Sequence, residues 1–525
     1  MMNNDYKVEV RRTCIIIHNY EPGEFDGLER TFSVYDKVRH RSYVKVIWYD
    51  VEKKDLYLPA GIDLSYIMNR YRGQKIARKL EPDPYDNIQR SKIKYKPRDI
   101  RQSKAIDFCL GLGKYHMNQD KSQISLNLNT GVGKTYVAIY VANILAKKTM
   151  MITSSLNWIE QWKNKILEYC VDVKEEEIYV ISGTASIAKL LLGIKDLENI
   201  KYYLVSIDTF KSYADKYSWE KLRELFRKLK IGTKIFDEAH LYFEANCMMD
   251  YFSDVDKTLY LTATPMRADR KENYIYQLSY KNVPRISLFD QEKDPRTRYE
   301  AYMYSSHPSP KEITSMRNAY GFNRIKYTSY LAKKPIYNTL LDYVVNLIYT
   351  KTSPKGKALI YIGTNEVIKE TCRYLISKYG DISLGVYTSI IPKDKKDDQL
   401  NRKIIISTTK SFGAAMDVKN LEMIILLNEP FKFAGTTIQT LGRTRDDNTV
   451  YIEFVDTGFD DLMRYYRTKQ KVFNKYATSC NAYNFAQVNK EFDQLYTESR
   501  MRDNSFRNDR KQVMTFKDKN REEDN

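Results

Sequence analysis

Apolar residues recur with two different periods, and the two alternate through most of the chain. A run of alternating residues from Ile124 to Leu128 predicts a strand, and helical spacing of apolar residues follows over 137–145. Short β-branched or aromatic runs predict further strands at 149–153, 178–182, 202–207, 233–237, 258–262, 357–362, 384–387, 403–407, 423–427 and 450–455. Strands that alternate with helices predict α/β lobes, in which parallel sheets carry helices on both faces and ligands bind at the carboxyl ends of the strands.

Three segments have a different pattern. Residues 30–35 and 43–49 show the alternation of strands and 64–71 the spacing of a helix, so a small strand-rich accessory domain is expected over 1–92. Residues 286–330 are weakly patterned, and we interpret them as a connector. The tail, 481–525, is polar and of mixed charge, and it is expected to be disordered.

Composition describes a soluble globular protein, with 42% hydrophobic and 29% charged residues in a chain of 525. No run approaches 18 apolar residues and no signal peptide opens the chain, so we expect a cytoplasmic protein, in the host cytoplasm if the source is a phage or virus. The net charge of +19 suits a polyanion partner, and nucleic acid is the commonest. A lysine-rich solvated surface explains the charge equally well. Six dispersed cysteines without a CxxC pair indicate reduced thiols.

The strongest chemical signal is the turn between the strand at 124–128 and the helix after it. It has the sequence Asn129-Thr130-Gly131-Val132-Gly133-Lys134-Thr135. A glycine-bearing turn between a strand and a helix is typical of a phosphate-binding loop, whose backbone N–H groups surround the phosphates of a nucleotide. In such a loop Lys134 supplies a positive charge near the β and γ phosphates, and the Thr135 hydroxyl can bind Mg²⁺. The alternative is a glycine turn that precedes Lys-Thr by chance.

A second signal follows the strand at 233–237, where Asp237-Glu238-Ala239-His240 begins. A carboxylate at the tip of a neighbouring strand is placed to bind Mg²⁺, and Asp237 suits that role. Glu238 is then placed to orient and deprotonate the attacking water. Without the phosphate loop, the same four residues could be a helix N-cap with an acidic first turn.

The phosphate loop, the sequence DEAH at 237–240 and the sequence TATP at 262–265 occur in the order and spacing of one family. In this respect the chain resembles superfamily 2 helicases and translocases of the DEAH-box type. The resemblance implies two RecA-like lobes in tandem, over 93–285 and 331–480, and the use of ATP and Mg²⁺. Residues 97–106 are similar to the glutamine motif, which makes Gln102 the expected adenine contact. The same resemblance assigns the coupling of hydrolysis to motion to His240, Thr262 and Thr264.

Further blocks resemble the family's motifs Ia, Ib, IV, V and VI, at 152–162, 205–210, 358–364, 407–417 and 439–445. The implied nucleic-acid contacts are Ser154, Thr209, Gly363, Thr364, Thr408 and Thr409. Asp417 and Gln439 are implied nucleotide contacts, and Arg443 and Arg445 are implied catalytic arginines. The chain departs from the family at the last position, because the second arginine of motif VI comes one residue early and Asp446 stands in its place.

The resemblance is closest in appearance to phage UvsW-like helicases and poxvirus-type transcript-release helicases. It implies an ATP-driven DNA helicase in repair, recombination or replication, with single-stranded, forked or branched DNA as its partner. It would act as a monomer or with other replication, repair or transcription proteins. The alternatives are a translocase that releases transcripts or bound proteins without unwinding, an RNA helicase, the motor subunit of a restriction system, and a nucleic-acid-binding protein without activity.

Overall fold

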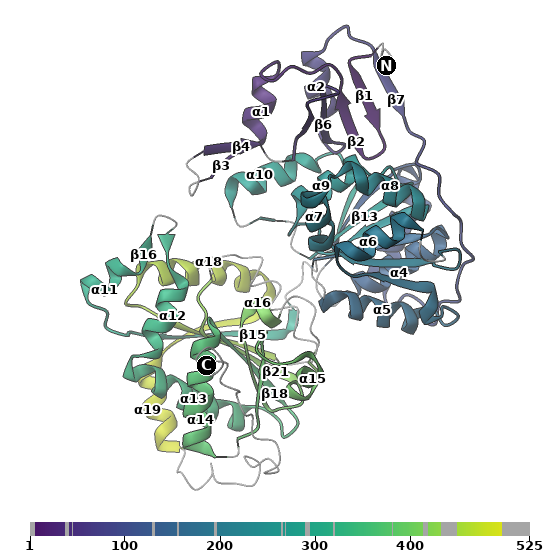
Figure 1. Cartoon of the computed structure of the whole chain (residues 1–525). Helices are drawn as coiled ribbons and strands as arrows, with labels where there is room; N and C mark the ends of the chain where they lie inside the picture. Colours follow the sequence, from purple (N-terminus) through teal and green to yellow (C-terminus); the bar gives the residue numbers. More distant parts are fainter. Residues whose placement is uncertain are drawn as a thin grey trace, which may run out of the picture. The chain divides into compact units, whose positions relative to one another are not determined.

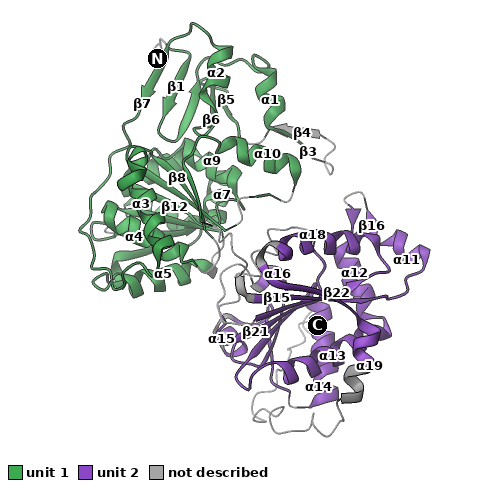
Figure 2. Cartoon of the chain, turned by 180° about the vertical axis from the view of Figure 1, so that it is seen from behind, with its two compact units in different colours: residues 1–290 green, residues 291–525 purple. Residues whose placement is uncertain are grey.

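The structure is a computed structural model, and it divides into two compact units, residues 1–290 and 291–525 (Figure 2). It describes residues 6–36, 41–44, 46–128, 132–154, 157–193, 197–263, 266–267, 269–288, 294–318, 321–380, 382–412, 418–431 and 449–495. Each unit contains one large parallel sheet, as the alternation of strands and helices predicts.

The N-terminal part of the first unit is a five-stranded sheet with the order β5-β6-β2-β1-β7. Its strands are β1 (Val8–Arg11), β2 (Cys14–Ile17), β5 (Trp48–Asp50), β6 (Asp55–Pro59) and β7 (Ile76–Lys79). Neighbouring strands are antiparallel except β1 and β7. Helix α2 (Leu64–Arg70) confirms the predicted helix.

The predicted strand at 30–35 is wrong in its first half. Residues Asp26–Phe32 form helix α1, and only Ser33–Asp36 form a strand, β3, which pairs with β4 (Arg41–Val44) in a separate hairpin. Leu28 and Phe32 are both buried and lie four residues apart, so they share one helical face. Burying both side chains on one face favours a helix here, although the β propensity of the segment favours a strand.

The large sheet of the first unit has seven parallel strands in the order β10-β11-β9-β12-β13-β8-β14. Their bounds are Gln123–Leu128 (β8), Thr149–Thr153 (β9), Ile178–Ile181 (β10), Tyr202–Ser206 (β11), Thr233–Phe236 (β12), Lys257–Thr262 (β13) and Arg285–Leu288 (β14). Six of these confirm predicted strands within one or two residues. The seventh, β14, begins at the edge of the segment interpreted as a connector.

Helices cover this sheet (Figure 1). They are α3 (Ile100–Leu110), α4 (Lys134–Leu145), α5 (Asn157–Tyr169), α6 (Gly183–Leu192), α7 (Ile207–Lys216), α8 (Glu220–Leu229), α9 (Phe243–Tyr251) and α10 (Arg270–Ser279), with short 3-10 turns at Gly113–Asn118 and Glu175–Glu177. Helix α4 follows the phosphate loop, as predicted.

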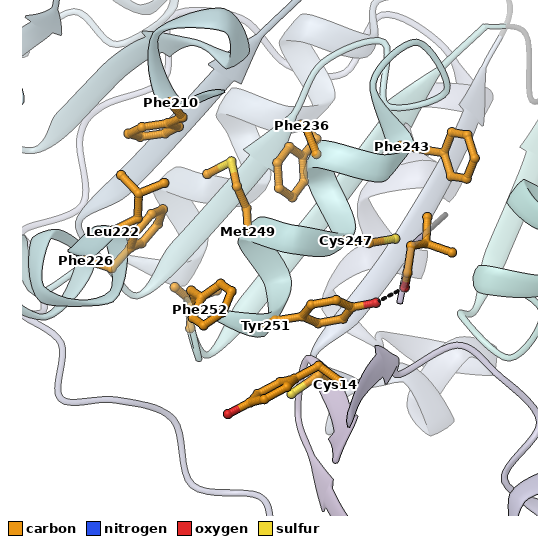
Figure 3. Packing of buried hydrophobic residues seen from close by; sticks show 14 of the residues in the cluster. Cys14, Phe210, Leu222, Phe226, Phe236, Phe243, Cys247, Met249, Tyr251 and Phe252 are labelled. Atoms are coloured by element: carbon orange, nitrogen blue, oxygen red, sulfur yellow. Dashed lines mark hydrogen bonds between the residues drawn. The ribbon is translucent and has the colours of Figure 1, made fainter. Parts of the chain in front are cut away.

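The N-terminal sheet and the large sheet of this unit share one apolar core. A single cluster of buried residues includes Cys14 and Tyr57 from the N-terminal strands and Tyr251 and Phe252 from the end of α9. Figure 3 shows Cys14, Tyr251 and Phe252 among the packed side chains of this cluster. The Tyr251 hydroxyl also donates a hydrogen bond to the carbonyl of Val46. The two parts are therefore joined by packed side chains and not only by the chain between them.

The second unit is built on another sheet of seven parallel strands, in the order β19-β20-β18-β21-β22-β15-β23. The strands are Asp294–Tyr304 (β15), Lys357–Ile362 (β18), Leu384–Tyr387 (β19), Ile404–Ser407 (β20), Leu421–Asn428 (β21), Thr449–Asp456 (β22) and Ala477–Asn484 (β23). Its helices are Pro310–Ser315 (α11), Arg324–Ala332 (α12), Pro335–Lys351 (α13), Asn365–Tyr379 (α14), Lys393–Gln399 (α15), Thr409–Phe412 (α16), Asp460–Tyr476 (α18) and Phe485–Leu495 (α19), and Arg317–Asn318 pairs with Gly321–Phe322.

The structure corrects two predictions, one for the segment interpreted as a connector and one for the C-terminal tail. The eleven-residue strand β15 lies in the segment interpreted as a connector, and it pairs with β22 and β23 inside the sheet. Residues 481–495, expected to be disordered, form the end of β23 and helix α19, because Phe485 is buried in the core of this unit. The rest of the tail, from 496, lies outside the described residues. Among the described helices, none has both the length and the apolar sequence needed to cross a bilayer.

Candidate functional site

Three neighbouring strands of the first unit bring the predicted nucleotide-binding residues to one edge. β12, β13 and β8 are adjacent and parallel, so their carboxyl ends meet. The phosphate loop follows β8, Asp237 follows β12, and Ala263 follows β13. Of the phosphate loop, Val132 to Thr135 belong to the described residues, whereas Asn129, Thr130 and Gly131 lie outside them.

The end of the loop has a conformation that only glycine adopts easily. Gly133 has a φ of +95°, and a Cβ atom there would lie 2.5 Å from the Gln102 side-chain nitrogen. Lys134 is the first residue of α4, and its Nζ lies 3.9 Å from Oε1 of Glu238. The lysine charge is therefore held between the loop and the acidic residue that follows β12.

Gln102, the predicted adenine contact, is buried and bonded at both ends of its amide. Its Nε2 donates to the Val132 carbonyl at 2.8 Å, and its Oε1 accepts from the backbone N–H of Arg98 at 2.7 Å. Gln102 lies on α3, and Asp99 caps the start of this helix by accepting hydrogen bonds from the backbone N–H groups of Arg101 and Gln102. Gln102 thus fixes the loop, while one amide hydrogen and one lone pair remain for a base.

The Asp237 carboxylate is held by donors on both oxygens. Oδ2 accepts from the indole N–H of Trp162 at 2.9 Å, and Oδ1 accepts from the backbone N–H of Glu238 at 3.0 Å. Burial raises the pKa of Asp237 to about 6, and the neighbouring charge of Glu238 adds to the effect, while the Trp162 hydrogen bond and the charge of Lys134 oppose it. A positive charge at this edge would favour the ionised carboxylate.

Glu238 is the most unusual residue of the site. It is 4% exposed and has a left-handed backbone with a φ of +45°, a conformation that costs a non-glycine residue about 1 kcal/mol. Its Oε2 is buried and finds no hydrogen-bond partner among the described residues. A buried carboxylate oxygen without a donor is costly, so it indicates a place where a bound molecule supplies one.

His240 connects this carboxylate to the next strand. Its Nδ1 lies 2.9 Å from the hydroxyl oxygen of Thr262 and 3.4 Å from Oε2 of Glu238. Burial lowers the pKa of His240 to about 3, and the charges of Arg267 and Lys134 lower it further, so the ring is neutral near pH 7. The structure brings together two of the three residues predicted to couple hydrolysis to motion, and the third, Thr264, lies outside the described residues.

Sequence reasoning missed the roles of Trp162 and Arg267. The Arg267 guanidinium donates from Nη1 to the carbonyls of His240 and Leu241 and from Nη2 to Glu272, which ties the segment after β13 to the one after β12. The segment that resembles motif Ia contains Trp162, but nothing in its spacing shows a contact with an acid 75 residues away. Such contacts appear only when the parallel strands are assembled.

The two residues of the first unit that are predicted to contact nucleic acid are both buried. Ser154 at the end of β9 is buried, and so is Thr209 in the first turn of α7. The Thr209 hydroxyl lies 2.9 Å from that of Ser206, the residue that caps α7. Their contacts with nucleic acid stay predictions.

In the second unit the corresponding residues meet at the end of β21. The Gly363 N–H donates to the Asn428 carbonyl at 3.0 Å, and a Cβ at Gly363 would lie 2.4 Å from the Thr328 hydroxyl. Thr364 caps α14, and the Thr409 N–H donates to Oε2 of Glu429 at 2.7 Å. Burial raises the pKa of Glu429 to about 7, against the hydrogen bonds from Thr409.

Of the remaining candidate site residues in the second lobe, Thr408 belongs to the described residues and the others do not. Thr408 is buried at the end of β20, and its Oγ1 accepts from the backbone N–H of Ser411 at 2.9 Å. Asp417, Gln439, Arg443 and Arg445 lie outside the described residues, so their predicted roles stay predictions.

The chain is similar to several known proteins. Residues 90–267 match the family model "Type III restriction enzyme, res subunit". The chain is 24% identical over 365 residues to "Putative helicase 161L" of Invertebrate iridescent virus 6, which covers 66% of this chain and 75% of the relative. It is 26% identical over 347 residues to "Transcript termination protein A18" of Yaba-like disease virus, which covers 61% and 64%.

Among solved structures, "S. cerevisiae Dbp5 bound to RNA and ADP BeF3" aligns with a TM-score of 0.50 and 15% identity, over 77% of this chain and 94% of that one. This likeness concerns the fold, and it confirms the two RecA-like lobes. The structure of T4 UvsW aligns over 91% of this chain and 100% of that one at 13% identity, with a TM-score of 0.34, which is too low to carry an argument. By its sequence matches and its fold, the chain is similar to superfamily 2 helicases, ATP-binding hydrolases that act on nucleic acid.

Proposed function

We propose that this protein hydrolyses ATP to move along DNA and to unwind or remodel it, in repair, recombination or replication. The observation that carries the proposal is Oε2 of Glu238, a buried oxygen that lacks a hydrogen-bond partner within the described chain. It lies on the residue whose other carboxylate oxygen is 3.9 Å from Lys134 Nζ. A water molecule that donates to Oε2 would lie next to the lysine that binds the γ-phosphate.

The roles of the chain's own groups follow from these positions. Lys134 binds the β and γ phosphates, and Gln102 contacts adenine. Glu238 orients the attacking water and takes its proton, which requires the ionised carboxylate. His240, neutral and bonded to Thr262, relays the state of Glu238 to the end of β13.

The residues of the site also fit Mg²⁺. No group of three or more His, Cys, Asp and Glu side chains in the described ranges could hold a metal by itself. Mg²⁺ is usually bound by one or two protein oxygens together with substrate phosphates, and the Thr135 hydroxyl and the Asp237 carboxylate offer that number. When bound, the ion neutralises the charge that develops on the phosphates.

A second function is favoured by one of the comparisons. The relative in Yaba-like disease virus is named a transcript termination protein, so the same motor could release a transcript without separating two DNA strands. The two functions share the ATP site and differ in what the movement displaces. The +19 net charge suits either, because phosphate contacts are independent of sequence.

One set of measurements separates these proposals. The ATPase rate of the full chain is measured with single-stranded, duplex and forked DNA and with RNA, and the opening of a fluorescent forked duplex is followed in parallel. Stimulation by DNA together with opening of the fork supports the helicase. Stimulation without opening, together with release of RNA from a stalled transcription complex, supports the second function. Stimulation by RNA alone would make the protein an RNA helicase, and an absence of ATPase with every polynucleotide overturns both proposals.

A further inference from the structure

The indole N–H of Trp162 donates to one oxygen of the carboxylate that the proposed function assigns to Mg²⁺. The nitrogen lies 2.9 Å from Oδ2 of Asp237, while the backbone N–H of Glu238 donates to Oδ1. Each carboxylate oxygen can accept about two hydrogen bonds, so one lone pair on each stays available. Two donors from two different elements therefore fix the rotation of this side chain.

The position of Trp162 is set by packing and not by the site. Its side chain is 2% exposed, and it belongs to the same apolar cluster as Ile159 and Ile166 of α5 and Ile235 of β12. A buried tryptophan needs a hydrogen-bond partner for its N–H, and here that partner is Asp237. A phenylalanine keeps an aromatic ring at this position but has no N–H group to orient the carboxylate.

We propose that Trp162 is a positioning residue for magnesium, which holds the Asp237 carboxylate in the orientation that binds the ion. The inference rests on the proposed function, because it needs a metal at Asp237. Partners that orient a metal ligand from the outside typically change metal affinity by about 10- to 100-fold when they are removed. Trp162 thereby makes the affinity for the ion depend on the placement of α5, the helix that follows Ser154.

Trp158 offers a matched control. It lies one turn earlier on α5 and packs against the same apolar cluster, but it is only partly buried. The substitution Trp158→Phe removes the same N–H group from the same helix. A loss that comes only from loosening α5 would appear in both variants, whereas a loss that comes from the bond to Asp237 would appear only in Trp162→Phe.

The experiment measures metal binding directly, with Mn²⁺ as the probe for Mg²⁺. Free Mn²⁺ is followed by electron paramagnetic resonance in a titration of the full chain with ADP bound, and ADP affinity without metal is measured separately. Trp162→Phe is expected to bind Mn²⁺ about 10- to 100-fold more weakly. Its ADP affinity without metal should stay within about twofold, and Trp158→Phe should match the wild type in both measurements.

Equal Mn²⁺ affinity in Trp162→Phe and the wild type would overturn the inference, and so would equal losses in the two phenylalanine variants. If Trp162→Phe does not fold, benzothienylalanine at position 162 keeps the shape of the indole and lacks only the N–H. The same weakening is then expected from that protein, and wild-type affinity in it would overturn the inference. A wild-type chain that binds neither ADP nor Mn²⁺ would instead contradict the proposed function.

Discussion

His240 Nδ1 lies 2.9 Å from the hydroxyl oxygen of Thr262. This contact joins the segment that follows β12 to the end of β13. The same nitrogen lies 3.4 Å from Oε2 of Glu238. A change at Glu238 that moves the ring is therefore transmitted to Thr262, the last residue of β13. In the proposed mechanism this contact transmits the state of the nucleotide.

The substitution Thr262→Val tests this contact, because it keeps the shape of the side chain and removes its hydroxyl. We expect nucleotide affinity to stay within about twofold. Stimulation of ATPase by polynucleotide should fall by about five- to tenfold, the effect of losing one hydrogen bond of about 1 kcal/mol. The control is Thr258→Val on the same strand, since the buried Oγ1 of Thr258 has no hydrogen-bond partner in the described part of the chain. Equal losses in both variants would show that strand packing, and not the contact with His240, is responsible.

Lys134 and Glu238 should fail in different ways. Lys134→Ala removes the charge near the phosphates, so it should lose nucleotide binding, whereas Glu238→Gln should bind ATP and remain on the nucleic acid. General-base catalysis contributes about 10²- to 10⁴-fold, and turnover by Glu238→Gln should fall by that factor. Binding of a fluorescent ATP analogue and steady-state ATPase distinguish the two effects. Glu244→Gln, on α9, is the control, and wild-type turnover by Glu238→Gln would contradict the assignment of the base.

Arg443 and Arg445 are predicted from the resemblance to act on ATP. An arginine that neutralises charge in the transition state contributes about 10³- to 10⁵-fold in characterised phosphoryl-transfer enzymes. We therefore expect alanine at either position to leave ATP affinity nearly unchanged and to abolish most of the turnover. Single-turnover hydrolysis measures this directly. A near-normal rate for Arg445→Ala would leave Arg443 as the only arginine with this role.

The parallel sheets could be predicted from sequence because their strands are buried on both faces. Strands such as β9 and β18 are short, almost continuously apolar runs between helices, and each was predicted with its observed bounds. β15 has no such run, because Arg298 and Glu300 alternate with buried tyrosine and alanine. Its place in the sheet depends on pairing with β22 and β23, which lie about 150 to 180 residues away along the chain.

Some residues of the candidate site could likewise be predicted from the sequence, and others could not. Lys134, Asp237 and Glu238 belong to short motifs whose chemistry fixes the residue type, so the sequence predicts them as candidates, and the structure places them at one edge of the sheet. Trp162 and Arg267 act through contacts with residues far away in the chain, and their residue types are common in other surroundings. Their roles required the assembled sheet.

The shared core of the first unit changes how the N-terminal domain can be tested. Deleting residues 1–90 would expose Tyr251 and Phe252, so a substitution at the contact is more informative. The Phe252 ring is 2% exposed and lies 4.9 Å from the ring of Trp48. Phe252→Ala is expected to reduce the free energy of unfolding of this unit by about 3–5 kcal/mol. Urea unfolding followed by tryptophan fluorescence measures it, and Tyr274→Ala, at a ring that is 54% exposed, should change it by less than about 0.5 kcal/mol.

His18 should make the N-terminal domain less stable at alkaline pH. Its ring lies between two carboxylates, with Nδ1 2.7 Å from Asp55 and Nε2 3.1 Å from Glu9. Burial alone would lower the pKa of His18, but the hydrogen bonds and charges of Asp55 and Glu9 outweigh it and raise the pKa to about 9. The charged groups around this pair include Arg11, 2.5 Å from Glu9, and Lys79, 3.6 Å from it.

The direction of the effect follows from proton binding. Between the ordinary pKa of histidine, about 6.5, and the folded value of about 9, the folded chain holds a proton that the unfolded chain has lost. Stability contributed by His18 is therefore complete below pH 6.5 and is lost as the pH rises to about 9, with a slope that approaches 1.4 kcal/mol per pH unit for one proton. Urea unfolding at several pH values should show this decline in the wild type and a flatter profile in His18→Gln. The exposed His116 serves as the control through His116→Gln, whose profile should follow the wild type. If the free energy of unfolding of His18→Gln declined with pH as steeply as that of the wild type, the proton held by the folded chain would belong to another group.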